Sequence, residues 1–194
     1  MRIFVSRHGQ TDWNVKGLQQ GWTDIPLNET GLGQARQLAQ SLQGSSIRHV
    51  YTSCLSRANV TGQTVADLLG VPCEIIPGIQ EIGLGDWQGY TWAETCEKWP
   101  ELTAKWVEEP LTTAPANGEN YQQLIDRFVA AIHKIMRGPD EDVLVVSHGG
   151  CLHTIFCVMD DIPLKNMQND NIIPNAKAVE LDMEKFLRKW PLEK

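Results

Sequence analysis

The sequence predicts an α/β protein built as three layers, α/β/α, around a mainly parallel central sheet. Two observations carry this prediction. Apolar runs of β type alternate along the chain with segments of helical periodicity, which is the pattern of α/β proteins. Residues 143–147 (VLVVS) are nearly all apolar, as expected of a strand that is buried on both faces. Because no internal repeat, low-complexity stretch or linker divides the 194 residues, we expect a single domain over 1–194.

Five segments have the pattern of strands, and five others have apolar residues at helical spacing. The predicted strands are residues 2–6, 48–52, 73–76, 143–147 and 178–182. The predicted helices are residues 31–43, 56–69, 92–108, 120–137 and 150–159. The C-terminal stretch 183–194 is interpreted as a short helix or a frayed tail.

Residues 83–119 differ from the rest of the chain because glycine and proline recur throughout them. We interpret this stretch as a partly helical excursion from the sheet, placed where it could cap an active site. Thr91 and Glu94 fit the T-x-x-E capping box at the start of its helix. The excursion is therefore expected to be ordered.

Composition and charge exclude several classes of protein. The net charge of −7 argues against a nucleic-acid partner or an anionic membrane surface. No apolar stretch is long enough to span a bilayer, and the N-terminus enters a strand pattern directly, without a signal peptide. The five cysteines are odd in number and show no paired spacing, so we expect reduced thiols and a cytoplasmic location.

Polar residues follow four of the predicted strands. Because ligands bind beyond the carboxyl ends of parallel strands, these residues are expected on one rim of the sheet. Arg7 and His8 follow the first strand, and Arg57 lies one turn into the helix after the second. Glu81 lies in the loop after the third strand, and His148 follows the fourth strand and opens a helix.

This set of side chains suits phosphoryl transfer. A phosphomonoester is a dianion, and planar guanidinium groups such as those of Arg7 and Arg57 bind its oxygens well. The helix N-terminus after His148 is expected to add backbone donors and a favourable dipole. A nucleophilic histidine must be neutral, and two nearby guanidiniums should lower the pKa of His8. Glu81 is the candidate proton donor to the leaving oxygen and then the base for water.

Six blocks in matching order carry a resemblance to a known family. They are residues 7–14 (RHGQTDWN), 20–27 (QGWTDIPL), 31–35 (GLGQA), 51–58 (YTSCLSRA), 81–89 (EIGLGDWQG) and 146–150 (VSHGG). With these blocks the chain resembles the histidine phosphatase superfamily, whose founding members are the cofactor-dependent phosphoglycerate mutases. The resemblance covers most of the chain and implies a phosphoglycerate mutase-like fold.

The resemblance also implies roles for individual residues. His8 would be the nucleophile that becomes phosphohistidine, and Glu81 the acid and base. The phosphate pocket would use the side chains of Arg7, Arg57, His148, Asn14 and Gln20 and the backbone N–H of Gly149. No metal and no cofactor is expected. The implied partner is a small phosphorylated metabolite, and a homodimer is possible.

Within this family the sequence favours a phosphatase over a phosphoglycerate mutase, which stays as the alternative. The mutases that resemble this chain carry a longer, basic insertion after the acid/base glutamate, where they hold a small acid. Here the lysines and arginines of residues 86–120 are Lys98 and Lys105 alone, and the stretch has no arginine. Residues 115–124 also resemble the P-x-x-G-E-S element of the phosphatase branch, with Asn120 in place of serine.

The sequence leaves two other interpretations. A phosphate-binding protein without catalysis is a third hypothesis, although such a member should have lost His8, Arg57 or His148. His153 and Cys157 are four residues apart near His148, so a metal site is conceivable, but a buried structural role is the better interpretation.

Three tryptophans of the excursion, Trp92, Trp99 and Trp106, recur every seven residues and would share one face of the helix 92–108. Core packing is expected of at least two of them. The alternative is an aromatic lid over the phosphate rim that would set the leaving-group preference.

Overall fold

The computed structural model describes residues 1–166 and 173–192, which contain one five-stranded sheet. In spatial order its strands are β3 (Cys73–Ile75), β2 (Ile47–Thr52), β4 (Asp142–Ser147), β1 (Ile3–Arg7) and β5 (Ala178–Glu180). The four strands β1–β4 are parallel, and β5 joins the β1 edge in the antiparallel direction. The prediction of a mainly parallel sheet is confirmed.

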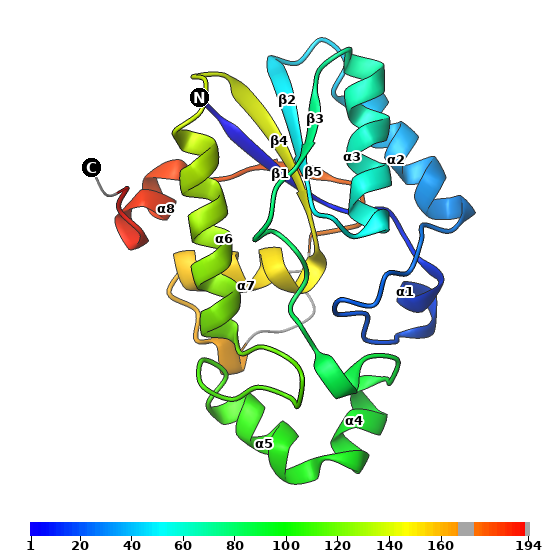
Figure 1. Cartoon of the computed structure of the whole chain (residues 1–194), viewed down its shortest axis with the longest axis vertical. Coiled ribbons are helices and arrows are strands. Elements are labelled where there is room, and N and C mark those ends of the chain that lie inside the picture. The colour runs from blue at the N-terminus through cyan, green and yellow to red at the C-terminus, as the bar shows by residue number, and fades with distance from the viewer. Residues whose placement is uncertain (167–172, 193–194) are drawn as a thin grey trace.

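Helices cover both faces of the sheet, so the three-layer arrangement is confirmed (Figure 1). On one side lie α2 (Glu29–Ser41) and α3 (Ser56–Leu69), and on the other lie α6 (Tyr121–Met136) and α7 (Gly149–Met159). Near the C-terminal end, α8 (Met183–Lys189) packs on α7, so residues 183–189 form a short helix. Four of the five predicted helices match observed helices to within two residues at each end, as is usual at helix ends.

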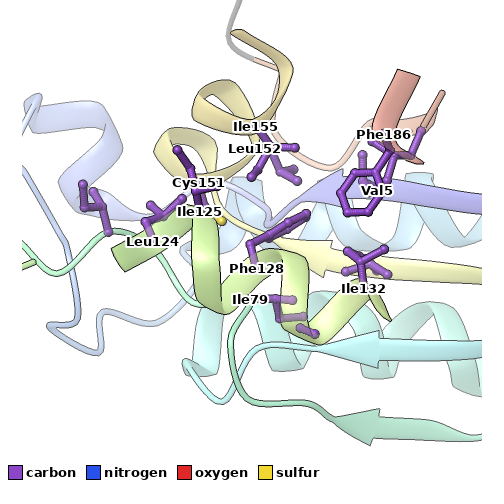
Figure 2. Close-up of a cluster of buried hydrophobic side chains, with 14 of the residues drawn as sticks. Val5, Ile79, Leu124, Ile125, Phe128, Ile132, Cys151, Leu152, Ile155 and Phe186 are labelled. Carbon is purple, nitrogen blue, oxygen red and sulfur yellow. The ribbon is translucent and has the colours of Figure 1, made fainter. Parts of the chain in front are cut away.

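The hydrophobic core is divided by the sheet into two clusters, because successive side chains of a strand point to opposite faces. On β4, Val143 and Val145 face the α6 and α7 side, whereas Leu144 and Val146 face α2 and α3. All four are buried, which confirms a central strand buried on both faces. In the larger cluster Phe128 of α6 lies among side chains from α7, α8 and the sheet (Figure 2).

The excursion forms a helical lobe beyond the carboxyl ends of the strands, at the lower end of the molecule in Figure 1. It consists of the 3₁₀ helix η1 (Gly85–Trp87), α4 (Trp92–Lys98) and α5 (Pro100–Glu108). The capping box at Thr91 and Glu94 is present. A single helix over 92–108 is wrong, because Pro100 disfavours helical backbone at Trp99, where φ is −131° and ψ is 58°.

This break changes the positions of the three tryptophans. Trp106 is buried in the core, and Trp99 packs against the core, which confirms the expectation for two of the three. Trp92 is 44% exposed. The expectation that all three share one helix face is wrong, since Trp92 and Trp106 belong to different helices.

Two further short elements occur that the sequence analysis did not predict. They are α1 (Asp12–Lys16), directly after the first loop, and the 3₁₀ helix η2 (Leu164–Asn166). In the described part of the chain no helix is long and apolar enough to cross a membrane. The five cysteines are free thiols.

The position of Phe128 predicts a large effect of truncation. Phe128 is fully buried, so Phe128→Ala is expected to lower the free energy of unfolding by about 3–5 kcal/mol, through lost burial and the cavity left behind. Leu68→Ala, at an exposed position on α3, is the control and should change it by less than about 0.5 kcal/mol. Urea unfolding at neutral pH measures both, and equal effects would contradict the assignment of the core.

Candidate active site

Backbone hydrogen bonds hold three of the strand ends together at one rim. The N–H of His8, directly after β1, donates to the carbonyl of Ser147 at 3.1 Å. The N–H of Ser53, directly after β2, donates to the carbonyl of Val146 at 3.2 Å. Because both acceptors belong to β4, the loops after β1 and β2 begin beside His148, the residue after β4. The expected convergence of the strand ends is therefore observed.

His8 is buried at the base of the rim, and its ring has one defined tautomer. Its Nδ1 lies 2.6 Å from the carbonyl oxygen of Gly9. A carbonyl only accepts, so Nδ1 carries the proton and the Nε2 of the neutral ring keeps a lone pair. Burial, and then the charges of Arg57 and Arg7, hold the pKa of His8 well below its usual value of 6.5. The expected neutral histidine is thus present, with burial as the larger cause.

His148 lies beside His8, with 5.2 Å between the ring centroids. Its Nε2 is 2.9 Å from the hydroxyl of Ser53, which fixes the ring plane. Burial, followed by the charge of Arg57, lowers the pKa of His148 well below 6.5. Both imidazoles are therefore neutral at pH 7.

The two arginines are held in different ways. Arg57 has no exposed surface, and its terminal nitrogens donate to the carbonyls of Gly21 at 2.8 Å and Thr23 at 2.9 Å. Arg7 lies against the first turn of α7, where a Cβ on Gly149 would come within 2.9 Å of its Nε. Glycine at 149 is what lets the guanidinium lie there. Burial lowers the pKa of both arginines, and both stay charged in the neutral range.

Glu81 occupies the N-terminus of α7. Its Oε2 accepts from the N–H of Gly150 at 3.0 Å, and its Oε1 accepts from the N–H of Cys151 at 2.8 Å and of Ile82 at 3.0 Å. A Cβ at residue 150 would lie 2.8 Å from Oε1, so the second glycine makes room for the carboxylate. The expectation that this helix end donates to phosphate needs correction, because two of its N–H groups bind Glu81 instead.

Glu81 reaches the rim although β3 lies at the far edge of the sheet. The chain after β3 crosses the end of β4, where the hydroxyl of Ser147 donates to the carbonyl of Ile79 at 2.7 Å. Ile76, Ile79 and Ile82 are buried in the core cluster of α6 and α7. The loop thus delivers Glu81 to the N-terminus of α7.

Arg127 of α6 fixes this loop, and the sequence analysis missed it. Its guanidinium donates to the carbonyls of Gly78 at 2.7 Å, Gln80 at 2.8 Å and Glu81 at 2.8 Å. It also forms an ion pair with the buried carboxylate of Glu119, which in turn accepts from the N–H of Gly83 at 2.9 Å. Glu119 stands in the P-x-x-G-E element. That motif was the available signal for Glu119, whereas nothing in the helical periodicity singles out Arg127.

The rim opens into a cavity of about 710 Å³ lined by most of the expected site residues. Asn14 and Gln20 both line it. The Oδ1 of Asn14 also accepts from the N–H of Thr11 at 3.0 Å, which caps α1, so this residue has a structural role as well. The expected site residues that line the cavity are Arg7, His8, Asn14, Gln20, Arg57 and Glu81.

Several buried polar atoms at this rim have no hydrogen-bond partner among the described residues. They are the Nε of Arg7, the Nε of Arg57, the Nδ1 of His148 and the Oε1 of Gln20. Buried polar groups are normally hydrogen-bonded, so a cluster of free ones points to a ligand that completes them. Three of the four are nitrogens that can donate, two of them in guanidinium groups, and an anion with several oxygens fits these three.

A metal site at α7 is not formed within residues 1–166 and 173–192. No group of three or more histidine, cysteine or carboxylate side chains gathers there in a geometry that could hold a metal ion. His153 and Cys157 are both buried in α7, in line with the structural interpretation.

Comparison with known proteins agrees with this geometry. A sequence model of the histidine phosphatase superfamily (branch 1) matches residues 3–190. The chain belongs to this superfamily. A solved structure, YhfR of Bacillus stearothermophilus, superposes with a TM-score of 0.83 at 31% identity, covering 92% of this chain and 89% of that one.

Two curated relatives are phosphatases. The metal-independent phosphoserine phosphatase of Arabidopsis thaliana is 38% identical over 159 residues, which are 79% of this chain and 66% of that protein. The adenosylcobalamin/alpha-ribazole phosphatase of Salmonella typhimurium is 32% identical over 168 residues, 86% of this chain and 83% of that protein. Together with the family, these relatives confirm the expectation of a phosphatase.

The Arg127 network predicts a structural penalty for its removal. Arg127→Ala would leave the Glu119 carboxylate buried without its partner, so the free energy of unfolding should fall by about 3–5 kcal/mol. Arg137→Ala, at an exposed position just past the same helix, is the control and should be near neutral. Chemical denaturation compares the two, and a small effect at Arg127 would show that the loop is held by other contacts.

The two buried neutral histidines predict a dependence of stability on pH. In the unfolded chain His8 and His148 titrate near 6.5, whereas in the folded protein both pKa values lie well below this. Below pH 6.5 the unfolded state therefore binds more protons, and the free energy of unfolding falls by up to about 1.4 kcal/mol per pH unit for each histidine. Denaturation at pH 7, 6 and 5 measures the slope. His8→Asn and His148→Asn should each reduce it, and an unchanged slope in both would refute the assignment.

Proposed function

We propose that this phosphatase hydrolyses phosphomonoesters through a phosphohistidine on His8, without a metal ion. The observation that carries the proposal is the neutral His8 ring, whose Nε2 keeps a lone pair beside two guanidinium groups at the base of the cavity. A neutral imidazole is a nucleophile, and the adjacent cations attract the phosphate dianion to it.

The first half-reaction transfers the phosphoryl group to the enzyme. The His8 Nε2 attacks phosphorus from the side opposite the leaving oxygen, so the N–P bond forms as the P–O bond to the alcohol breaks. Glu81, in its protonated form, gives its proton to the departing oxygen, and the alcohol leaves neutral. Arg7 and Arg57 stabilise the charge on the non-bridging oxygens, and their free Nε–H groups are suited to that contact.

The second half-reaction regenerates the enzyme. The Glu81 carboxylate takes a proton from a water molecule that attacks phosphorus, the P–N bond breaks, and inorganic phosphate leaves. His148 holds the phosphoryl group through its unpartnered Nδ1. Asn14 and Gln20, which line the cavity, supply further polar contacts, and the family resemblance adds the N–H of Gly149, which is not among the lining residues. Because the arginines supply the positive charge, the scheme needs no metal ion.

The substrate class is a small phosphorylated metabolite, since the relatives bear the names of different phosphomonoesterases. The lysines of the excursion support hydrolysis over mutase activity. Lys98 lies over the ring of Tyr90, with 3.9 Å from Nζ to the centroid, and Lys105 lies 3.9 Å from Glu109. Neither lines the cavity, so neither is placed to clamp the carboxylate of a phosphoglycerate. Lys165 does line the cavity, and its Nζ lies 4.0 Å from the carboxylate of Glu108.

We retain two expectations from the sequence alongside this function. The five free thiols support a reducing compartment, which favours the cytoplasm. A homodimer stays a prediction, to be measured by light scattering of the purified chain.

The deciding experiment is a steady-state assay of phosphate release with and without EDTA, on wild-type protein and His8→Ala. We expect activity that is insensitive to EDTA and falls at least about 1000-fold in the variant, because the nucleophile is lost. His133→Ala, outside the site, is the control. Acid quenching should trap an acid-labile phosphoryl group on His8. The mutase alternative predicts instead little release and rapid conversion of 3-phosphoglycerate in the presence of 2,3-bisphosphoglycerate.

A further inference from the structure

The cavity has two chemically different parts. Its base holds the histidine, the two arginines and Glu81. Its outer wall, formed by the excursion and neighbouring loops, is lined by apolar side chains that include Trp87, Trp92, Trp106, Val107, Tyr121 and Leu164. A phosphoryl group occupies only the base of a cavity of about 710 Å³, so most of the space belongs to the rest of the substrate.

The aromatic residues of the wall form one packed cluster. The ring of Trp87 meets Trp106 edge to face, with centroids 5.2 Å apart, and Trp106 lies 4.8 Å from the ring of Tyr121. These three side chains are buried, which makes them the rigid backing of the wall. Trp92 packs edge-on against Trp87 at 6.1 Å.

Trp92 differs from the other three because 44% of it is exposed although it lines the cavity. A large apolar side chain that is exposed inside a concave site is a common feature of ligand-binding surfaces. It stands at the first position of α4, where the Thr91–Glu94 capping box fixes the backbone. Trp92 thus combines a fixed backbone with an aromatic side chain that lines the cavity and is not covered by packing.

Charged groups are scarce on this wall. Among the described residues that line it, the one charged side chain is that of Lys165. This side chain is about half exposed, and its Nζ lies 4.0 Å from the carboxylate of Glu108. The amide of Gln19 also lines the cavity, but its Nε2 already donates to the hydroxyl of Thr95 at 2.6 Å. The wall has no free pair of opposite charges for a leaving group with both an ammonium and a carboxylate.

We propose that this wall is a leaving-group subsite for alcohols that carry an aromatic or heteroaromatic ring, with Trp92 as the specificity-determining residue. The proposal rests on the proposed function, since it names the substrate class of the same site. Stacking of a ring on an exposed tryptophan stabilises the bound ester, whereas the ammonium of a small zwitterionic leaving group meets no carboxylate on the wall and loses hydration there.

Four phosphate esters test the preference: ethyl phosphate, 2-(1-naphthyl)ethyl phosphate, O-phosphoserine and 3-phosphoglycerate. All four leave as alkyl alcohols, so differences in kcat/KM chiefly report the binding of the remainder. We expect ring stacking to give the naphthyl ester a kcat/KM about 100-fold above that of ethyl phosphate, and the two charged esters to be poorer substrates than the naphthyl ester. A preference for phosphoserine or phosphoglycerate would overturn the proposal.

Variants at Trp92 assign the preference to this side chain. Trp92→Ala should lower kcat/KM for the naphthyl ester about tenfold and leave ethyl phosphate unchanged. Trp92→Phe should recover most of the loss, and Leu68→Ala, exposed on the distant α3, should change neither substrate. An equal loss on both esters in Trp92→Ala would indicate a merely structural role and overturn the assignment.

A binding measurement separates this proposal from the proposed function. Naphthylmethylphosphonate and methylphosphonate are not hydrolysed, and calorimetry on the wild-type protein compares their affinities directly. Tighter binding of the naphthyl compound to the wild-type protein, with a smaller difference in Trp92→Ala, supports the subsite. This holds even if no ester is turned over, and in that case only the hydrolytic proposal fails. Equal affinities, together with turnover that depends on His8, would overturn the subsite and leave the hydrolytic proposal standing.

Discussion

The parallel pairing of β4 with β1 on one side and β2 on the other is the constraint on which the site depends. The first residue after β1 and the first residue after β2 both donate a backbone hydrogen bond to β4, so the two loops leave the sheet beside His148. In the observed register Arg7 pairs with Ser147 and Thr52 pairs with Val146, so both neighbouring strands end beside the end of β4. This register brings the ring centroids of His8 and His148 to 5.2 Å from each other.

A concentration of buried positive charge is the second feature of the molecule. Arg57 is held by two backbone carbonyls, and Arg7 lies against a glycine at the start of α7. Such contacts fix position without neutralising charge, so the field adds to the burial that lowers the pKa of the two neighbouring imidazoles and keeps them neutral. Electrostatic preorganisation of this kind requires that the cations be buried before the substrate arrives.

The loop that carries Glu81 is secured by different means from the strand ends. An ion pair between Arg127 and Glu119, with three backbone carbonyls on the same guanidinium, replaces the hydrogen bonds that a strand would have. Glu81 itself occupies the N-terminal donors of α7. The sheet thus holds the His8 side of the site and α6 holds the Glu81 side, while residues of the excursion line much of the cavity wall.

The sequence by itself determined the fold class, the strands and the residues of the rim, because these follow from local periodicity and from motifs at strand ends. Only the tertiary structure decided that Glu81 occupies the α7 N-terminus, that Arg127 holds its loop, and that Trp92 is exposed. Each of these depends on contacts between segments far apart in the chain. The periodicity of a helix does not show which of its polar residues faces a loop that lies about 50 residues away in the sequence. The seven-residue spacing of the three tryptophans was misleading, because it places them on one face only if residues 92–108 form one helix. Pro100 breaks that helix.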